Sequence, residues 1–212
     1  MPGADGGAVG AAARAVLDLA LSRRPTLGGG RLVCLDGPAG SGKTTLAAAV
    51  LDRCPEARLV HMDDLYDGWE GLPRVADQLP ALLSPLTRGE ASHYRRFDWH
   101  AGRYAEEVPV EPAPLLVVEG VGSGAVSVAD LVTVLVWVSA PPDLRRARGL
   151  ARDGAAMAPA WERWMRDEAA HLARERTEAR ADVLVDGTGQ RPVVVRPFRT
   201  AAAPPGATPG CP

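Results

Sequence analysis

Short apolar runs alternate with amphipathic stretches along the chain. The runs are nearly continuous, which is typical of strands that a parallel sheet buries on both faces. They lie at 31–35, 58–61, 115–118, 131–138 and 182–185, and residues 193–195 are a candidate sixth strand. Apolar residues at helical spacing predict helices over 9–21, 43–51, 75–86, 141–152 and 161–179. This alternation predicts an α/β fold, with a parallel sheet of about five strands and helices on both faces.

Other segments depart from this pattern. We expect residues 1–30 to form an N-terminal helix and linker, residues 31–196 to form the main domain, and residues 197–212 to be a flexible Ala/Pro/Gly tail. Residues 87–114 are polar, aromatic and proline-containing, which favours an irregular or small-hairpin insert. Pro80 and Pro85 are expected to bend or split the helix at 75–86.

Composition narrows the class of protein. With 212 residues, 46% of them hydrophobic, the chain can bury one core. A net charge of −2 argues against a general nucleic-acid binder. The run Leu131–Val138 is too short to span a membrane, and residues 1–13 show no secretory signal. Three cysteines (Cys34, Cys54 and Cys211) without a CxxC pair favour a reducing, cytoplasmic location. Whether the chain forms a homo-oligomer stays open.

The strongest motif is a glycine-rich loop between a predicted strand and a predicted helix. Residues 37–44 read GPAGSGKT and match G-x-x-x-x-G-K-[ST] in full. Such a loop curls backbone N–H groups around phosphates at a helix N-terminus, so the sequence predicts a P-loop NTPase-type sheet. We expect the nucleotide phosphates to be bound by Gly37, Pro38, Ala39, Gly40, Ser41, Gly42, Lys43, Thr44 and Thr45.

Two side chains of this loop carry specific chemistry. Lys43, the only lysine among 24 basic residues, supplies a compact charge for the β- and γ-phosphates of ATP. The hydroxyl of Thr44 is suited to Mg²⁺. ATP and Mg²⁺ are therefore the expected cofactors. Adenine contacts are expected near Gly187–Arg191, after the fifth strand.

Acidic residues follow the predicted strands, and ligands of open α/β sheets bind beyond the carboxyl ends of strands. Asp63 is placed to deprotonate an acceptor hydroxyl, and Glu119 to help hold hydrated Mg²⁺. In the competing interpretation, Asp63 and Asp64 form a turn and Glu119 only caps a loop. Asp36 directly precedes the glycine-rich loop and is expected to brace it.

Taken in order, these motifs resemble the uridine kinase family of P-loop kinases. The segments that carry the resemblance are LVCLDGPAGSGKTT, HMDDLY, RRFDWH, LLVVEGV and PPDLRRARGLARD, within residues 31–187. The family phosphorylates a hydroxyl of a small molecule with MgATP, typically the 5′-hydroxyl of a pyrimidine nucleoside. The resemblance therefore implies a phosphotransferase with a small-molecule acceptor.

The resemblance also implies roles for individual residues. Asp63 matches the catalytic aspartate, and Tyr66 matches an aromatic residue of the substrate pocket. Asp98 matches an acidic residue that grips the sugar, and Glu119 the acidic residue after the third strand. Arg148 and Arg152 match arginines of a lid, here around residues 145–165, that approach the transferred phosphate. The segment 154–159 (GAAMAP) replaces a second arginine cluster of the family, and Trp99 departs from its pattern.

Weaker features keep two interpretations each. Arg145, Arg148 and Arg152 share one helical face, which suits either a catalytic lid or a solvated surface. Trp161, Trp164 and Met165 favour packing over base stacking. The segment 94–104 is rich in aromatic and charged residues, including His100 and Arg103, and suits either a ring-bearing substrate or a surface flap.

Three functions compete on these residues. The first is a kinase in which Lys43, Asp63, Arg148 and Arg152 are catalytic and the acceptor is a nucleoside such as uridine or cytidine. The second is a P-loop kinase for a sugar, a vitamin or a nucleoside monophosphate. The third is a regulatory ATPase, for which the sequence offers no clear water-positioning group.

Overall fold

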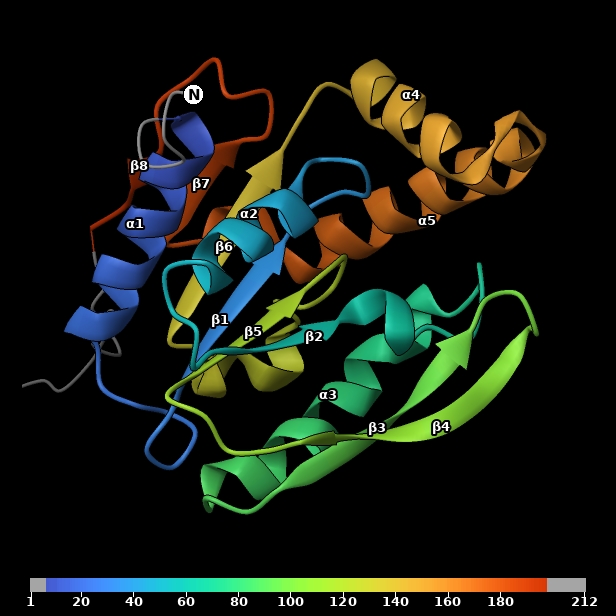
Figure 1. The fold of residues 1–212 in the computed structure, drawn as a ribbon. Coiled ribbons are helices and arrows are strands. Elements are labelled where there is room, and N and C mark those ends of the chain that lie inside the picture. Colours follow the sequence, from blue (N-terminus) through green and yellow to red (C-terminus); the bar gives the residue numbers. More distant parts are fainter. Residues whose placement is uncertain (1–6, 198–212) are drawn as a thin grey trace, which may run out of the picture.

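A six-stranded sheet forms the centre of the molecule, of which the computed structural model describes residues 7–197. The strand order is β2-β5-β1-β6-β7-β8 (Figure 1). The strands are β1 (Arg31–Asp36), β2 (Arg58–His61), β5 (Leu115–Glu119), β6 (Val134–Ser139), β7 (Val183–Asp186) and β8 (Val194–Val195). All neighbours pair in parallel except β7 and β8. The predicted α/β fold is confirmed, and the candidate sixth strand is an antiparallel edge.

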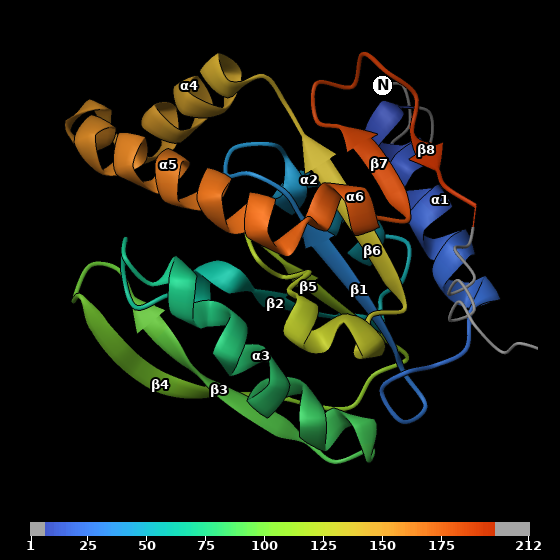
Figure 2. The same ribbon diagram turned by 180° about the vertical axis from the view of Figure 1, so that it is seen from behind.

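Helices cover both faces of this sheet, as expected. One face carries α1 (Ala8–Ser22) and α2 (Lys43–Leu51), and the other carries α3 (Leu72–Thr87), α5 (Ala158–Glu175) and α6 (Thr177–Arg180). Helix α4 (Pro142–Asp153) follows β6 and packs on α5 beyond the ends of the strands (Figure 2). The loops that follow β1, β2, β5 and β6 therefore lie at one edge of the sheet.

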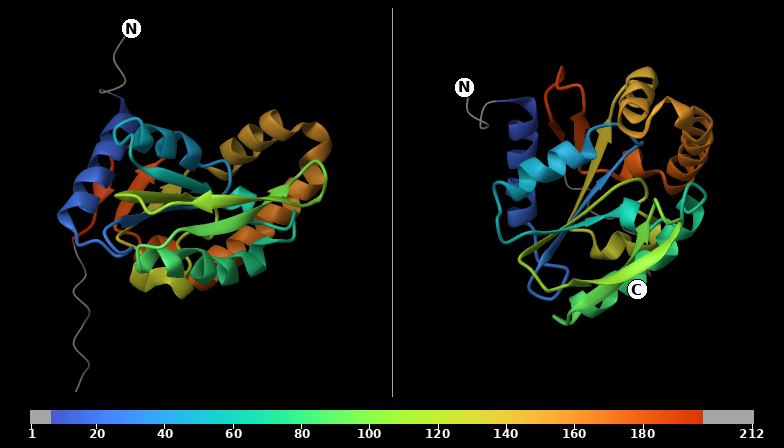
Figure 3. Two further views of the ribbon diagram at one scale, coloured as in Figure 1. Left: turned by 60° about the horizontal axis from the view of Figure 1, so that its bottom comes forward. Right: turned by 45° about the vertical axis from the view of Figure 1, so that its right-hand side comes forward.

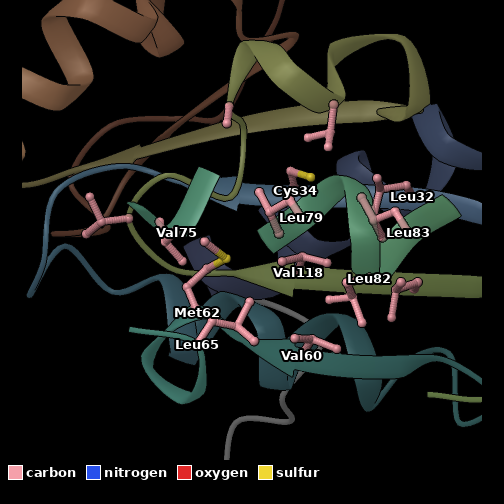
Figure 4. Close-up of a cluster of buried hydrophobic side chains, with 14 of the residues drawn as sticks. Leu32, Cys34, Val60, Met62, Leu65, Val75, Leu79, Leu82, Leu83 and Val118 are labelled. Atoms are coloured by element: carbon pink, nitrogen blue, oxygen red, sulfur yellow. The ribbon is translucent and has the colours of Figure 1, made fainter. Parts of the chain in front are cut away.

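The side chains of β1 alternate between two hydrophobic clusters. Leu32 and Cys34 face the cluster with α3, where Leu79 and Leu83 are fully buried (Figure 4). Val33 and Leu35 face the opposite cluster, which includes α1 and α2. The absence of a polar alternation in β1 thus follows from helices on both sides.

Helix α3 is continuous through Pro80 and Pro85, so the expected split of this helix is wrong. Both prolines lie inside the helix, where each lacks the N–H for one backbone hydrogen bond. The apolar face of α3, which includes Val75, Leu79 and Leu82, is buried. Burial of this face outweighs the lost hydrogen bonds, because tertiary packing supplies most helical stability.

The insert at 87–114 is a β-hairpin rather than an irregular loop. Strands β3 (Ser92–Asp98) and β4 (Arg103–Val110) pair antiparallel, with a register shift between Arg95 and Phe97. The hairpin forms a separate two-stranded sheet and packs on α3 (Figure 3). Its far end reaches the segment that follows β2, where 3₁₀ turn η1 (Met62–Asp64) lies.

Several predicted boundaries shift in the structure. Leu131 ends the 3₁₀ helix η2 (Val126–Leu131), so β6 starts three residues later than the apolar run. Short η3 (Ala155–Met157) joins α4 to α5, and the left-handed conformation of Arg176 (φ 52°) separates α5 from α6. Of the expected tail, residues 198–212 lie outside the described part of the chain. None of the helices within 7–197 combines the length and the apolar composition that a membrane crossing needs.

Candidate functional site

The glycine-rich loop turns tightly between β1 and α2, as the motif predicts. Gly37 and Gly42 have φ angles of 134° and 105°, which side-chain-bearing residues rarely adopt. A Cβ atom on Gly37 would lie 2.1 Å from the carbonyl oxygen of Val138 on β6. The loop therefore packs closely against β6. Helix α2 begins directly at Lys43. This is the geometry that presents N–H groups to phosphates.

Lys43 is buried and held over the loop by backbone oxygens. Its Nζ donates to the carbonyls of Gly37 at 2.7 Å and Pro38 at 3.0 Å. Burial lowers the pKa of Lys43, and surrounding carboxylates, Glu119 foremost, oppose this shift. The Lys43 ammonium places a positive charge at the loop, and this charge attracts a phosphate bound there.

Glu119 lies at the end of β5 and connects the loop to β2. Its Oε1 accepts a hydrogen bond from Thr44 Oγ1 at 3.1 Å and lies 2.6 Å from His61 Nδ1. Burial raises the pKa of Glu119, but the contacts with His61 and Lys43 outweigh it and leave this pKa lowered. Glu119 is therefore a carboxylate at neutral pH, beside the hydroxyl predicted to bind Mg²⁺.

Asp63 follows β2, in η1, and its charge acts on both Lys43 and His61. Water reaches its side chain, yet the surrounding protein removes enough hydration to raise the pKa of Asp63, and the Glu119 charge adds to this. The positive charges of Arg152, Lys43 and His61 act in the opposite direction. Asp63 is thus within electrostatic range of both the loop lysine and an arginine of α4.

The β3–β4 hairpin holds the backbone around Asp63. The indole Nε1 of Trp99 donates to the Asp63 carbonyl at 2.9 Å, and the Tyr94 hydroxyl donates to Asp64 Oδ2 at 2.9 Å. Tyr104 donates from its hydroxyl to the Leu65 carbonyl at 3.0 Å. Three hairpin side chains therefore fix three consecutive residues of this turn. The aromatic segment has a bracing role that composition alone did not reveal.

Asp36 braces the site from below, as expected. Its carboxylate accepts backbone hydrogen bonds from Gly37 at 2.6 Å and from Gly122 and Gly124 at 2.9 Å each. Complete burial raises the pKa of Asp36 and these bonds counteract the rise. Asp36 therefore connects the loop after β1 to the loop after β5 and fixes the two loops relative to each other.

Two of the three arginines on one face of α4 lie at this site. Arg148 donates to the carbonyls of Gly40 at 3.1 Å and Gly187 at 3.2 Å. Arg152 pairs with Asp153 at 2.7 Å and lies over the ring of Trp161. The charge of Arg152 acts on Asp63. The approach of Arg148 and Arg152 to the transferred phosphate stays a prediction.

The third arginine is part of a buried ion pair that the sequence did not reveal. Arg145 Nη1 lies 2.5 Å from Glu168 Oε1, and both residues are buried. Glu168 Oε2 also accepts the N–H of Ala39 at 2.7 Å and the indole N–H of Trp164 at 3.2 Å. Glu168 has helical spacing with Trp161 and Trp164, and an acidic residue on such an apolar face was the available signal.

Four residues predicted to bind the substrate do not present an unengaged polar group beside Lys43 and Asp63. Tyr66 is fully buried, and its hydroxyl donates to the Val121 carbonyl at 2.6 Å. Asp98 Oδ1 accepts the N–H groups of His100 and Ala101 within the hairpin turn. His100 and Arg103 are exposed near the end of the hairpin. Their substrate roles stay predictions.

An aromatic cluster extends from the hairpin to α5. Trp69 makes edge-to-face contacts with Trp99 at 5.7 Å, Trp161 at 6.2 Å and Trp164 at 6.0 Å between ring centroids. Trp161 and Trp164 are buried, as the packing interpretation expected, while Trp99 is 39% exposed. The exposed part of Trp99 is available to a ligand next to Asp63.

The site combines the glycine-rich loop, which is suited to binding phosphates, with the carboxylates of Asp63 and Glu119. Within 7–197, His, Cys, Asp and Glu side chains form no group of three or more that could hold a metal by themselves. The oxygens of Thr44 and Glu119 instead suit Mg²⁺, which is commonly held by one or two protein groups together with substrate phosphates.

Known proteins share this arrangement of strands and loops. No family model matches the chain. The uridine kinase of Borrelia turicatae (strain 91E135) is 27% identical over 138 residues, which make up 58% of the chain and 67% of that relative. The structure of a possible uridine kinase from Bacillus stearothermophilus has a TM-score of 0.55 and 20% identity, covering 74% of the chain and 89% of that structure. The resemblance to uridine kinase-like P-loop kinases is confirmed.

A second solved structure is similar to a larger part of the chain. It is provisionally named as a fructose transport system kinase from Silicibacter sp. TM1040, with a TM-score of 0.60 and 22% identity. The likeness covers 84% of the chain and 97% of that structure. The fold is therefore that of P-loop kinases.

Proposed function

We propose that the protein is a kinase that transfers the γ-phosphoryl group of MgATP to a hydroxyl of a small molecule. The observation that carries this proposal is the position of Asp63. Asp63 directly follows β2 at the edge of the sheet where the glycine-rich loop lies, and its charge interacts with those of Lys43 and Arg152. An acceptor hydroxyl beside Asp63 would point toward a phosphate held by Lys43.

The proposed step is a direct transfer of the phosphoryl group from ATP to the acceptor hydroxyl. Asp63 accepts the proton of the acceptor hydroxyl, and the acceptor oxygen forms a bond to the γ-phosphorus. The bond from the γ-phosphorus to the β–γ bridging oxygen breaks, and ADP leaves with its electron pair. Lys43, Arg148 and Arg152 stabilise the negative charge that spreads over the transferred group.

Thr44 and Glu119 would hold the magnesium ion. Their oxygens lie 3.1 Å apart beside the loop, and the lowered pKa of Glu119 keeps it anionic. When bound, the ion supplies charge that neutralises the β- and γ-phosphate oxygens. The residues of the glycine-rich loop from Gly37 to Thr45 then supply the N–H groups and Lys43 for the phosphates.

A nucleoside such as uridine or cytidine is the first candidate for the acceptor. The Borrelia turicatae relative is named as a uridine kinase, and the exposed part of Trp99 suits a planar base. A sugar is the second candidate, since the broader structural match is to a kinase named for fructose transport. The residues implied for acceptor binding, which are Tyr66, Asp98, His100, Arg103 and Glu119, and the cytoplasmic location are predictions that belong to this proposal.

An ADP-release screen tests the proposal. Purified protein with MgATP is offered nucleosides, nucleoside monophosphates, pantothenate and simple sugars, and mass spectrometry identifies the phosphorylated product. We expect ADP release that depends on one acceptor class, with one phosphate added to the acceptor for each ADP formed. Steady ADP release without any acceptor would support the regulatory ATPase instead.

A further inference from the structure

A cavity lies beside the glycine-rich loop, on the side away from Asp63. Its volume is about 280 Å³. It is lined by α1, by the start of α2, by the ends of β6 and β7, and by the segment that joins β7 to β8. The lining side chains from the N-terminal helix are Ala8, Val9 and Ala12. The segment 187–191, where adenine contacts are expected, contributes Gly187 and Arg191 to this lining, but no role described above uses α1.

The strand order separates this cavity from the acceptor side of the site. Asp63 follows β2 and Glu119 ends β5, whereas the cavity lies by β6 and β7. Strand β1, which leads into the glycine-rich loop, lies between these pairs in the sheet. A nucleotide whose terminal phosphate points toward Asp63 would therefore extend its other end toward the cavity.

Contacts at the mouth of the cavity connect it to the phosphate loop. Gly42 and Thr45 belong to its lining. Arg148, also in the lining, bridges the carbonyls of Gly40 and Gly187. A Cβ atom on Gly187 would lie 1.7 Å from the Ser41 carbonyl oxygen, so the segment after β7 touches the loop directly. The cavity is thus a continuation of the cradle.

The chemistry of the lining suits a flat heterocycle rather than a phosphate. Most of the side chains are aliphatic, from α1, α2, β6, β7 and Val193, and the polar side chains of the lining are those of Thr45, Arg148, Asp186 and Arg191. Small-molecule sites are typically apolar cavities of roughly 300–1,000 Å³ with a few polar groups. The present volume is just below this range, which fits the base of a nucleotide but not the whole nucleotide.

We propose that α1 forms one wall of the site for the base of the nucleotide, with Val9 and Ala12 as its contacts. This inference rests on the proposed function, because it needs a nucleoside triphosphate in the glycine-rich loop. The helix is fixed in place, since Ala12, Ala13 and Val16 are buried against the sheet. The N-terminal helix is therefore part of the nucleotide site rather than an appendage to the domain.

The test compares two ligands that differ in the base. Isothermal titration measures the affinities of MgATP and of magnesium tripolyphosphate, which has the phosphates but no base. Val9→Gln places an amide at a wall position that is 38% exposed, so folding should be retained. Ala11→Gln is the matched control, because Ala11 is exposed on the same helix and outside the lining. Ala12→Leu, which fills the cavity, is a second variant.

We expect Val9→Gln to weaken MgATP binding about fivefold and to leave tripolyphosphate binding within about twofold, because only the base loses an apolar contact. Ala12→Leu should act in the same direction, and Ala11→Gln should change neither affinity. Unchanged MgATP affinity in folded Val9→Gln and Ala12→Leu proteins would overturn the role of α1. Equal losses for both ligands would also overturn it, since α1 would then support only the loop. If the unmodified protein bound no MgATP, the proposed function itself would fail and this inference with it.

Discussion

Glu168 on α5 accepts a hydrogen bond from the backbone N–H of Ala39 in the glycine-rich loop, at 2.7 Å. The same carboxylate lies 2.5 Å from Arg145 Nη1, and Arg145 also donates to the Ala39 carbonyl at 3.3 Å. Both polar groups of one loop residue are thus held by one buried ion pair. The pair connects α4 and α5 to the loop, so the position of the helices and the shape of the cradle depend on each other.

Glu168→Gln should destabilise the fold and weaken MgATP binding. The amide leaves Arg145 as a buried charge without its partner, and breaking a buried pair typically costs about 3–5 kcal/mol. Urea unfolding and titration with MgATP measure the two effects. Glu162→Gln is the control, because Glu162 pairs with Arg146 at 3.3 Å on the surface and such pairs contribute about 0–1 kcal/mol. Equal losses of stability in the two variants would contradict the role assigned to Glu168.

The sequence predicted the part of the site that depends on local spacing. Lys43 and Thr44 follow from a contiguous motif, and Asp63 and Glu119 follow from the rule that strand ends meet at one edge of a parallel sheet. The pairing of Arg145 with Glu168 joins residues 23 positions apart on two helices. Their meeting depends on how α4 packs on α5, which periodicity does not specify.

The fold was predictable for a similar reason. Its prediction was less definite where tertiary contacts determine the local structure. Runs such as 31–35 are continuous because both faces of the strand are buried, so the pattern itself carries the information. The hairpin at 92–110 has mixed polarity, since one side packs on α3 and the other meets solvent, and a register shift near Phe97 interrupts its alternation. Pro80 and Pro85 are weak breakers here, because the buried face of α3 outweighs them.

Asp63→Asn should abolish phosphoryl transfer and leave MgATP binding nearly unchanged. The amide cannot accept the acceptor's proton, and positioned general bases contribute roughly 10²–10⁴-fold to rates. It also removes a carboxylate whose raised pKa reflects a partial loss of hydration and the nearby Glu119 charge, so thermal stability near pH 7 should rise slightly. Coupled ADP assays, titration with MgATP and thermal melts measure the three quantities.

Asp64→Asn is the matched control for this substitution. Asp64 accepts the Tyr94 hydroxyl at 2.9 Å, and an amide oxygen can accept the same bond. Transfer should persist in Asp64→Asn at a rate within about threefold of the original, since the amide oxygen keeps the bond from Tyr94 that holds the turn, although a neutral acceptor binds more weakly than a carboxylate. A reversed pattern, with transfer lost only in Asp64→Asn, would make Asp64 the base.

The thermal stability should depend on pH through His61 and Glu119. The hydrogen bond to Glu119 raises the pKa of His61 above 6.5, so the pair contributes fully below pH 6.5 and is lost as pH rises through the raised pKa. Because 40% of the His61 side chain is exposed, we expect about 1 kcal/mol or less. Thermal melts from about pH 6 to about pH 9 compare His61→Gln with the original protein. The difference in Tm should shrink as pH rises, and a constant difference would exclude this linkage.

Trp99→Phe should lower kcat without a comparable change in MgATP affinity. The substitution keeps an aromatic ring in contact with Phe97 and Trp69, but it removes the indole N–H that donates to the Asp63 carbonyl. A hydrogen bond between neutral groups contributes about 1 kcal/mol, so a base held less firmly should reduce kcat about fivefold. Trp69→Phe is the control within the same aromatic cluster, because Trp69 contacts Trp99 through ring edges. If Trp99→Phe changed only the KM for the acceptor, Trp99 would act as a binding surface and the hairpin would not position Asp63.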